Sequence, residues 1–275
     1  MVLVATRDRF DLLTRQCIGA IRQQSVQPAL TVIVNDGRSL SPAEHAQIQA
    51  RLAPIRGVVL QNRHAPGAAG AWNTGLDYIR RHHDGFVALL DDDAEWDANH
   101  LEVNQAFARE HDADVVVSGL RRVVDGTDMP RPLVTNLNAR DFLVGNPGWQ
   151  GSNTFVSVRR LSQVHGFRNG LASLNDRDLA FRLLTSDGVR VAFTGTWTAS
   201  WHVSSHRTTL SSPRSAAKIS GLRWFWCIYR RAMSAGEASA FLQRAAHCFG
   251  VLPEEILRPG NDVPPHTRLD GDLDS

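Results

Sequence analysis

The sequence has few cysteines and no long apolar run. Its 275 residues include three cysteines, Cys17, Cys227 and Cys248, and no two of them have C-x-x-C spacing. An odd number of widely spaced cysteines argues against a disulfide framework and a zinc site, and is typical of a reducing compartment. No apolar run approaches the roughly 20 residues that a membrane-spanning helix needs, and no signal peptide is visible. We therefore expect a cytoplasmic protein.

A strong net charge is also missing. The 30 lysines and arginines nearly balance the 28 aspartates and glutamates, so the formal net charge is +2. Nucleic-acid-binding proteins usually carry a broad basic field, so this balance argues against a nucleic-acid partner. Apolar residues make up 43% of the chain, which is enough to bury a large core in one domain or in two fused lobes.

The first 120 residues alternate short apolar runs with helical patterns. The runs are VLVA, LTVIVND, GVVLQN, FVALLD and DVVVSGL. Such nearly continuous apolar runs are typical of strands that are covered on both faces. Between two of them, Ser41, Pro42 and Glu44 have the spacing of a capping box that starts a helix. The alternation predicts a doubly wound α/β sheet.

Beyond residue 120 the pattern changes. Hairpin-like segments lead to the Gly- and Trp-rich stretch GNPGWQGSN, a helix beginning at NDRDLAFRLL, and two short strands at VRVAF and TWTASWH. From about Ser212 the chain has a helical pattern. Residues 258–275 are rich in Pro, Gly and Asp, and we expect them to form a disordered tail.

Polar residues follow three of the expected strands, at residues 6–9, 35–37 and 91–93. Open α/β sheets bind ligands beyond the carboxyl ends of their strands. The strongest signal is ALLDDDAEW, because adjacent carboxylates repel one another and lose hydration when enclosed. A D-x-D site that holds a nucleoside diphosphate through a divalent metal fits better than an EF-hand, in which Gly would replace Trp96. We expect Asp97 to cap the helix that follows.

Several segments occur in a defined order from residue 2 to about residue 202. They are VLVATRDRFDLLTRQCIGAIRQQS, VIVNDGRS, APGAAGAWNTGLDYI, ALLDDDAEW, GSNTFVSVRRLSQVHGF and NDRDLAFRL. As an ordered set they resemble the motifs of inverting GT-A glycosyltransferases of family 2. The resemblance implies a GT-A nucleotide-binding, Rossmann-like mixed sheet flanked by helices, with a C-terminal helical extension. It divides the chain into a nucleotide-sugar lobe at 1–120, an acceptor and catalytic-base lobe at 121–210, helices at 211–257 and the tail.

The same resemblance implies roles for individual residues. Asp176 would be the catalytic base. Asp93 and His202 would bind the metal, Mn²⁺ or Mg²⁺, although a histidine after a strand can also be structural. The nucleotide-binding residues would be Thr6, Arg9, Asp36, Asp91 and Asp92.

Three residues are candidates for contacts with the acceptor, and two of them, Trp149 and Asp178, have structural alternatives. Trp149 could stack on a sugar or plug the core. Asn175 stands where the family has an acid. This replacement removes a neighbouring negative charge and so lowers the electrostatic repulsion on Asp176. Asp178 could contact the acceptor, cap a helix or form a salt bridge, and Asp176 itself could be a helix cap.

The chain departs from the family pattern at further positions. These are Asn35 for the first acid of the D-D-G-S turn, His165 for the first glycine of the Gly-Gly-Phe turn, and Arg7 and Asp8 for an aromatic residue and Asn.

The segment GLRWFWCIYRR near the C-terminus has two interpretations. As a helix it could rest on anionic lipid through Arg223, Arg230 and Arg231 and bring a lipid-linked acceptor to the site. It could equally pack its Trp and Phe side chains against the catalytic lobe and leave the arginines in solvent.

The function that the resemblance implies is metal-dependent, inverting transfer of a sugar from a nucleotide-diphosphate sugar, UDP-linked, to a hydroxyl of a glycan, glycolipid or small molecule. One alternative is a sugar-phosphate nucleotidyltransferase, which would need a Gly-rich loop after the first strand, whereas VLVATRDR has no glycine there. Another is a catalytically weak nucleotide-sugar-binding module, which the replacement at Asn175 suggests.

Overall fold

The computed structural model of the chain describes residues 1–129, 131–203 and 212–258. These residues form two compact units. The first contains residues 1–142, apart from 130, together with 146–170 and 175–203. The second contains 143–145, 171–174 and 212–258. Except for residue 258, the predicted tail lies outside the described residues.

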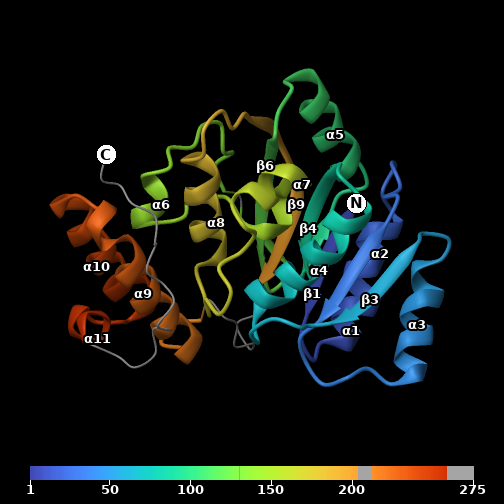
Figure 1. Cartoon of the computed structure of the whole chain (residues 1–275), viewed down its shortest axis with the longest axis horizontal. Helices are drawn as coiled ribbons and strands as arrows, with labels where there is room; N and C mark the ends of the chain where they lie inside the picture. The colour runs from blue at the N-terminus through green and yellow to red at the C-terminus, as the bar shows by residue number, and fades with distance from the viewer. Residues whose placement is uncertain (130, 204–211, 259–275) are drawn as a thin grey trace. The chain divides into compact units, whose positions relative to one another are not determined.

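A mixed β-sheet is the frame of the first unit (Figure 1). Its described strands are β1 (Val2–Thr6), β2 (Thr31–Asn35), β3 (Gly57–Gln61), β4 (Phe86–Asp91), β5 (Ala94–Trp96), β6 (Val115–Val124), β7 (Thr127–Met129), β8 (Thr154–Ser157) and β9 (Val191–Val203). Their order is β3-β2-β1-β4-β8-β6-β9-β5, and β7 pairs with β6. Strands β1 to β4 are parallel, whereas β8 is antiparallel to both of its neighbours, β4 and β6. The predicted strands of the first 120 residues are therefore confirmed.

Helices connect the strands and continue into the second unit. The α-helices are α1 (Phe10–Leu12), α2 (Ile18–Arg22), α3 (Pro42–Leu52), α4 (Ala68–His82), α5 (His100–Glu110), α6 (Asp141–Val144), α7 (Val158–Gln163), α8 (Asn175–Leu184), α9 (Ala216–Tyr229), α10 (Ala235–Phe249) and α11 (Pro253–Leu257). A π-helix at Leu13–Cys17 joins α1 to α2, and short 3-10 helices occupy Gly151–Asn153 and Arg230–Ala232. No helix among the described residues is long and apolar enough to cross a bilayer.

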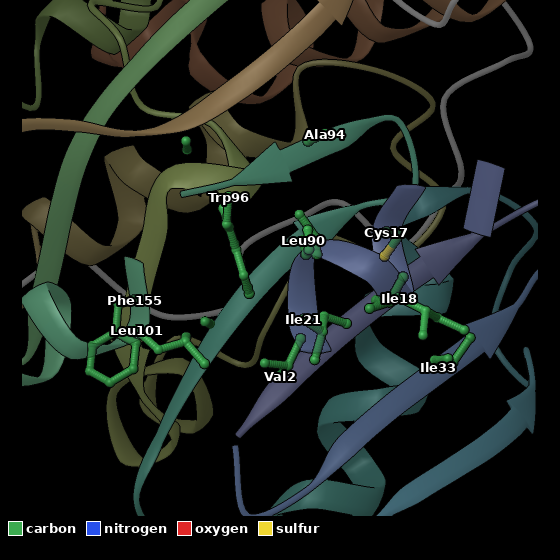
Figure 2. Close-up of a cluster of buried hydrophobic side chains, with 14 of the residues drawn as sticks. Val2, Cys17, Ile18, Ile21, Ile33, Leu90, Ala94, Trp96, Leu101 and Phe155 are labelled. Carbon is green, nitrogen blue, oxygen red and sulfur yellow. The ribbon is translucent and has the colours of Figure 1, made fainter. Parts of the chain in front are cut away.

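The sheet buries side chains on both faces, as the continuous apolar runs predicted. Because neighbouring residues of a strand point to opposite faces, Val2 and Val4 join one hydrophobic cluster and Leu3 joins another. Figure 2 shows part of the first cluster, in which Ile18 and Ile21 of α2 pack against the sheet. The second cluster contains apolar residues of α4, α7 and α8. The result is a three-layer α/β arrangement with the sheet in the middle.

Local signals placed one helix start correctly and another incorrectly. Ser41 is the N-cap of α3, and its reciprocal hydrogen bonds with Glu44 confirm the predicted capping box. Asp97 is not the cap of α5: the helix begins later, its N-cap is Asn99, and no side chain caps it. The Asp97 carboxylate instead accepts a hydrogen bond from Arg121 Nη1 at 3.1 Å. A charged partner on β6 thus determines the orientation of this side chain.

Two strands expected near residues 190 and 200 are one strand. β9 runs from Val191 to Val203 and pairs in parallel with β6, and the register shifts on either side of Gly119. These irregularities let β9 stay paired with β6 on both sides of the TGTW segment at residues 194–197.

In the second unit, the aromatic residues of α9 are packed rather than exposed. Trp224, Phe225 and Tyr229 are buried, and the Phe225 ring stacks on Phe241 of α10 with 5.8 Å between centroids. Arg230 lies over the Trp226 ring at 5.4 Å. These aromatic contacts lie within the second unit, and the lipid contact stays a prediction.

A matched pair of glycines tests the close approach of α4 to the sheet. A Cβ on Gly75 would lie 2.1 Å from Leu3 Cδ1, whereas a Cβ on Gly19 of α2 would meet nothing within 4 Å. We expect Gly75→Ala to lower the free energy of unfolding by roughly 1–3 kcal/mol through overpacking. Gly19→Ala should raise it by about 0.5–1 kcal/mol, since alanine favours a helix. Denaturant unfolding of both variants checks this, and equal effects would contradict it.

Candidate active site

Three of the predicted polar segments lie at the same edge of the sheet. Residues 6–9 begin at the last residue of β1, residues 35–37 begin at the last residue of β2, and the aspartates of the DDD run end β4 and lead into β5. Since β1, β2 and β4 are parallel and adjacent, their carboxyl ends meet. This is the position at which open α/β sheets bind ligands.

Two of the three consecutive aspartates are held by the turn after β1. Thr6 Oγ1 donates to Asp92 Oδ2 at 2.7 Å. Arg9 Nη1 lies 2.9 Å from both Asp92 Oδ1 and Asp93 Oδ2. Asp92 is buried, at 4% exposure, so Thr6 and Arg9 replace the water that its carboxylate loses. The predicted nucleotide-site residues Thr6, Arg9 and Asp92 thus form one network with Asp93.

Asp91 is held from the other side by a segment that sequence reasoning missed. Ser152 Oγ donates to Asp91 Oδ2 at 2.8 Å and accepts from the Asp91 backbone N–H at 3.1 Å. Trp96 Nε1 donates to the Ser152 carbonyl at 2.7 Å. A Cβ on Gly151 would lie 3.3 Å from Asp91 Oδ2, so the backbone of the 3-10 helix passes close to the carboxylate. The only signal for this contact was the unexplained Gly-rich stretch.

The carboxylates influence one another electrostatically. Burial of the carboxyl group, with the charges of Asp176 and Asp93, raises the pKa of Asp91 to about 8. Burial also raises the pKa of Asp92, despite its contacts with Arg9 and Thr6. Asp176 is therefore close enough to act on Asp91, although 85 positions in the sequence separate them. A bound cation would favour the charged forms of these carboxylates.

Asp36, after β2, is enclosed by hydrogen-bond donors. Its Oδ1 accepts from Asn62 Nδ2 at 2.5 Å, and its Oδ2 accepts from the Gly67 backbone N–H at 2.7 Å. Arg7 Nη1 lies 3.7 Å from Oδ2. Asn62 is itself fixed, since its Oδ1 accepts from Thr74 Oγ1 at 2.8 Å. Sequence reasoning selected Asp36 but missed Asn62 and Gly67.

Two of the segments that carried the family resemblance contact each other. Asn73, in the N-x-G sequence of α4, donates to the Phe167 carbonyl and accepts from its N–H, each at 2.8 Å. Phe167 ends the His-Gly-Phe turn, in which His165 and Gly166 have φ values of 58° and 66°. His165 therefore adopts the left-handed conformation even though it replaces a glycine.

The predicted base and its neighbour lie in the first turn of α8. The helix begins at Asn175, so Asp176 is inside it and is not its N-cap. The positive end of the helix dipole favours the ionised form of a carboxylate at this position. The amide oxygen of Asn175 is buried without a hydrogen-bond partner among the described residues.

Asp178 has a different environment. It is fully buried, and its carboxylate accepts from Arg168 Nε at 2.8 Å and from Arg182 Nε at 2.9 Å. This is the salt-bridge alternative that the sequence left open. Both carboxylate oxygens are engaged, which supports a structural role over contact with an acceptor.

Trp149 is also a packing residue. It is 1% exposed and lies edge-on to Phe142, with 6.0 Å between ring centroids. A buried indole has no free face for a sugar. The structure therefore supports the core-plug role and not the sugar-stacking role.

The two predicted metal ligands have other partners. Asp93 contacts Arg9, and His202 Nε2 lies 3.1 Å from Glu95 Oε2 on the neighbouring strand. Within the described ranges, no three His, Cys, Asp or Glu side chains form a group arranged to hold a metal ion. The metal assignment stays a prediction.

The buried pairs of Asp178 suggest a stability test. We expect Asp178→Asn to lower the free energy of unfolding by roughly 3–5 kcal/mol, because two arginines lose their carboxylate partner. Asp11→Asn is the matched control, since the Asp11 side chain is 82% exposed and lies 3.9 Å from Arg15. We expect it to change stability by less than about 1 kcal/mol. Thermal melts of both variants decide, and a small loss for Asp178→Asn would contradict the structural role.

Comparison with known proteins agrees with this geometry. The chain matches the model of the family described as Glycosyl transferase family 2 over residues 1–179. It is similar in structure to S. aureus TarS in complex with UDP-GlcNAc, with a TM-score of 0.62 and 18% identity over 91% of this chain and 72% of that one. For TarS in complex with UDP the TM-score is 0.58, at 18% identity over 89% and 71%. No curated protein sequence matches the chain.

The TarS likeness confirms the expected GT-A fold, and the family match covers well over half of the chain. The chain belongs to glycosyl transferase family 2 and is a glycosyltransferase.

Proposed function

We propose that this glycosyltransferase transfers a sugar from a nucleotide-diphosphate sugar, UDP-linked, to an acceptor hydroxyl, with a divalent metal and with inversion at the anomeric carbon. The observation that carries the proposal is the gathering of Asp91, Asp92, Asp93 and Asp176 at the ligand-binding edge of the sheet, where Arg9 contacts Asp92 and Asp93. The TarS complexes with UDP-GlcNAc and UDP support the choice of donor.

The residues at this edge fit Mn²⁺ or Mg²⁺ bound together with a diphosphate. Such metals are often held by one or two carboxylates plus substrate phosphates, so a site with three protein ligands is not required. Burial, together with the charges of Asp176 and Asp93, raises the pKa of Asp91 to about 8, and a cation at this place would favour its charged form. Asp93 and His202 would bind the metal, and His202 Nε2 lies 3.1 Å from Glu95 Oε2. A bound divalent cation would stabilise the charge on the departing diphosphate.

Asp176 would be the general base. As the acceptor oxygen forms its bond to the anomeric carbon, the bond from that carbon to the diphosphate oxygen breaks and the diphosphate leaves with the electron pair. The acceptor proton passes to the Asp176 carboxylate. A single in-line displacement with one base inverts the configuration at the anomeric carbon.

Thr6 and Asp36 would contact the nucleoside, with Asp36 oriented by Asn62 and Gly67. Asp91 would lie near the ribose, held by Ser152. The acceptor would be a glycan, glycolipid or small molecule, and Asn175 beside the base would contribute to its recognition.

Family membership and the absence of a glycine in the loop after β1 argue against a nucleotidyltransferase. A catalytically weak binding module would bind the donor but would not transfer or hydrolyse its sugar.

The test of donor and metal binding is a thermal-shift screen of the purified chain with UDP, GDP and ADP sugars, with and without MnCl₂, because a ligand that binds the folded state raises the melting temperature.

A shift by UDP-GlcNAc or another UDP sugar that requires manganese supports the proposal. Shifts that do not depend on metal would contradict metal dependence. Slow donor hydrolysis, followed by NMR of the anomer that is first released, reports inversion or retention. Binding without any turnover would favour the binding-module alternative.

The first functional prediction concerns the base. Asp176→Asn keeps the shape and removes the basicity, so we expect donor affinity within a few-fold and a rate of sugar transfer, or of donor hydrolysis, reduced by roughly a hundredfold or more. Asp187→Asn, which changes an exposed carboxylate just beyond the other end of α8, is the matched control and should keep the wild-type rate. Equal rates for Asp176→Asn and wild type would remove Asp176 from the mechanism.

The second concerns the metal. We expect Asp93→Ala to abolish the manganese dependence of nucleotide-sugar binding while the melting temperature without metal stays equal or rises, because a carboxylate leaves a like-charged cluster. Asp84→Ala, at an exposed position before β4, should retain the metal dependence. Metal-dependent thermal shifts that survive in Asp93→Ala would refute the assignment.

A further inference from the structure

The family match ends at residue 179, so it assigns no role to α9, α10 and α11. These helices form the second unit together with two short segments from earlier in the chain. One of these segments is Leu171–Leu174, which ends directly before Asn175, the first residue of α8. The segment that leads to the proposed base is therefore part of the same compact unit as the C-terminal helices.

Helix α9 contacts this segment at Ser173 with two residues one turn apart. Lys218 Nζ donates to Ser173 Oγ at 2.9 Å. A Cβ on Gly221 would lie 2.8 Å from both Ser173 Cβ and the Ser173 carbonyl oxygen, and 3.0 Å from its backbone nitrogen. Only a glycine at position 221 allows the helix to approach the backbone of Ser173 so closely.

The contact is buried on both sides. Lys218 is 3% exposed, Ser173 4% and Leu171 1%. The Lys218 ammonium also lies 4.5 Å from the centroid of the Phe249 ring on α10. Since a buried ammonium loses much hydration energy, its contacts with Ser173 and Phe249 hold it in a defined position.

The last residue of the segment has a strained backbone. Leu174 has a φ of 68°, in the left-handed region that leucine rarely adopts. Such a conformation costs of order 1–3 kcal/mol and persists only where the surroundings impose it. Leu174 follows Ser173 and precedes Asn175, so the fixed residue, the strained residue and the start of α8 are consecutive.

We propose that α9 is a positioning element for the catalytic base. By holding Ser173, three residues before Asp176, through Lys218 and Gly221, it imposes the turn at Leu174 and so sets the point at which the chain enters α8. The connection is the peptide chain itself. The proposal rests on the proposed function of Asp176 as the base, and it makes Lys218 and Gly221 positioning residues that do not touch the substrate.

The first test uses Gly221→Ala and its matched control Gly236→Ala. A Cβ on Gly236, in α10 of the same unit, would meet nothing within 4 Å. We expect Gly221→Ala to speed amide hydrogen exchange across residues 171–178 and to lower kcat for hydrolysis of UDP-GlcNAc, or of the sugar that gives the largest thermal shift, by about tenfold or more. Donor affinity should stay within about twofold, because the nucleotide site depends on other segments. Gly236→Ala should change none of these.

A milder pair keeps the test valid if Gly221→Ala folds poorly. Lys218→Met retains the length of the side chain and Ser173→Ala removes only a hydroxyl, so each deletes the same hydrogen bond. We expect both to lower kcat with donor affinity unchanged, and the double variant to be no slower than the slower single variant, which is the non-additivity of two residues acting through one contact.

Asp176→Asn, measured in parallel, separates the two proposals. If Asp176→Asn turns over as wild type does, the base assignment fails. If Asp176→Asn is slow but Lys218→Met and Ser173→Ala keep wild-type kcat, the positioning role of α9 is overturned. The same conclusion follows if donor affinity and kcat fall together, or if hydrogen exchange at residues 171–178 is unchanged in Gly221→Ala and Lys218→Met.

Discussion

Mutual repulsion among carboxylates at the end of β4 is the constraint on which the site depends. Each aspartate of the DDD run must be held by a donor, and the two neighbours of β4 in the sheet bring those donors. Strand β1 leads to Thr6 and Arg9, which hold Asp92 and Asp93. Strand β8 follows the 3-10 helix whose Ser152 holds Asp91. The order of the strands therefore decides which donors reach each aspartate.

Much of the fold could be predicted because its signals are local. Continuous apolar runs identified strands β1 to β4 and β6, although β3 at the sheet edge is only half-buried, and the capping box identified the start of α3. The position of the site followed from one rule, since residues after parallel strands meet at one edge of the sheet. Asp176 was placed by the motif resemblance alone, and its electrostatic effect on Asp91 shows that the fold brings the two carboxylates near each other.

What could not be predicted depends on partners that are distant in sequence. Ser152 and Asp91 are 61 residues apart, and Asn62 and Asp36 are 26 apart, so no local pattern connects them. Partners in the fold also changed the roles expected for Trp149 and Asp178. Their residue types fit a sugar-binding site, but Phe142 packs against Trp149, and Arg168 and Arg182 pair with Asp178, which gives both residues structural roles. The helix-capping prediction for Asp97 failed because Arg121, on another strand, competes for the carboxylate. Propensity identifies elements, whereas side-chain roles are decided by packing.

The position of β8 has a consequence for how the chain folds. This strand is inserted between β4 and β6, although it comes later in the sequence than both. Until residues 154–157 have been synthesised, β4 has an open edge at residues 86–88, and open apolar edges pair readily with other chains. The predicted nucleotide-sugar lobe, residues 1–120, ends before the strand that covers this edge. A truncation at that boundary therefore leaves a template for aggregation exposed.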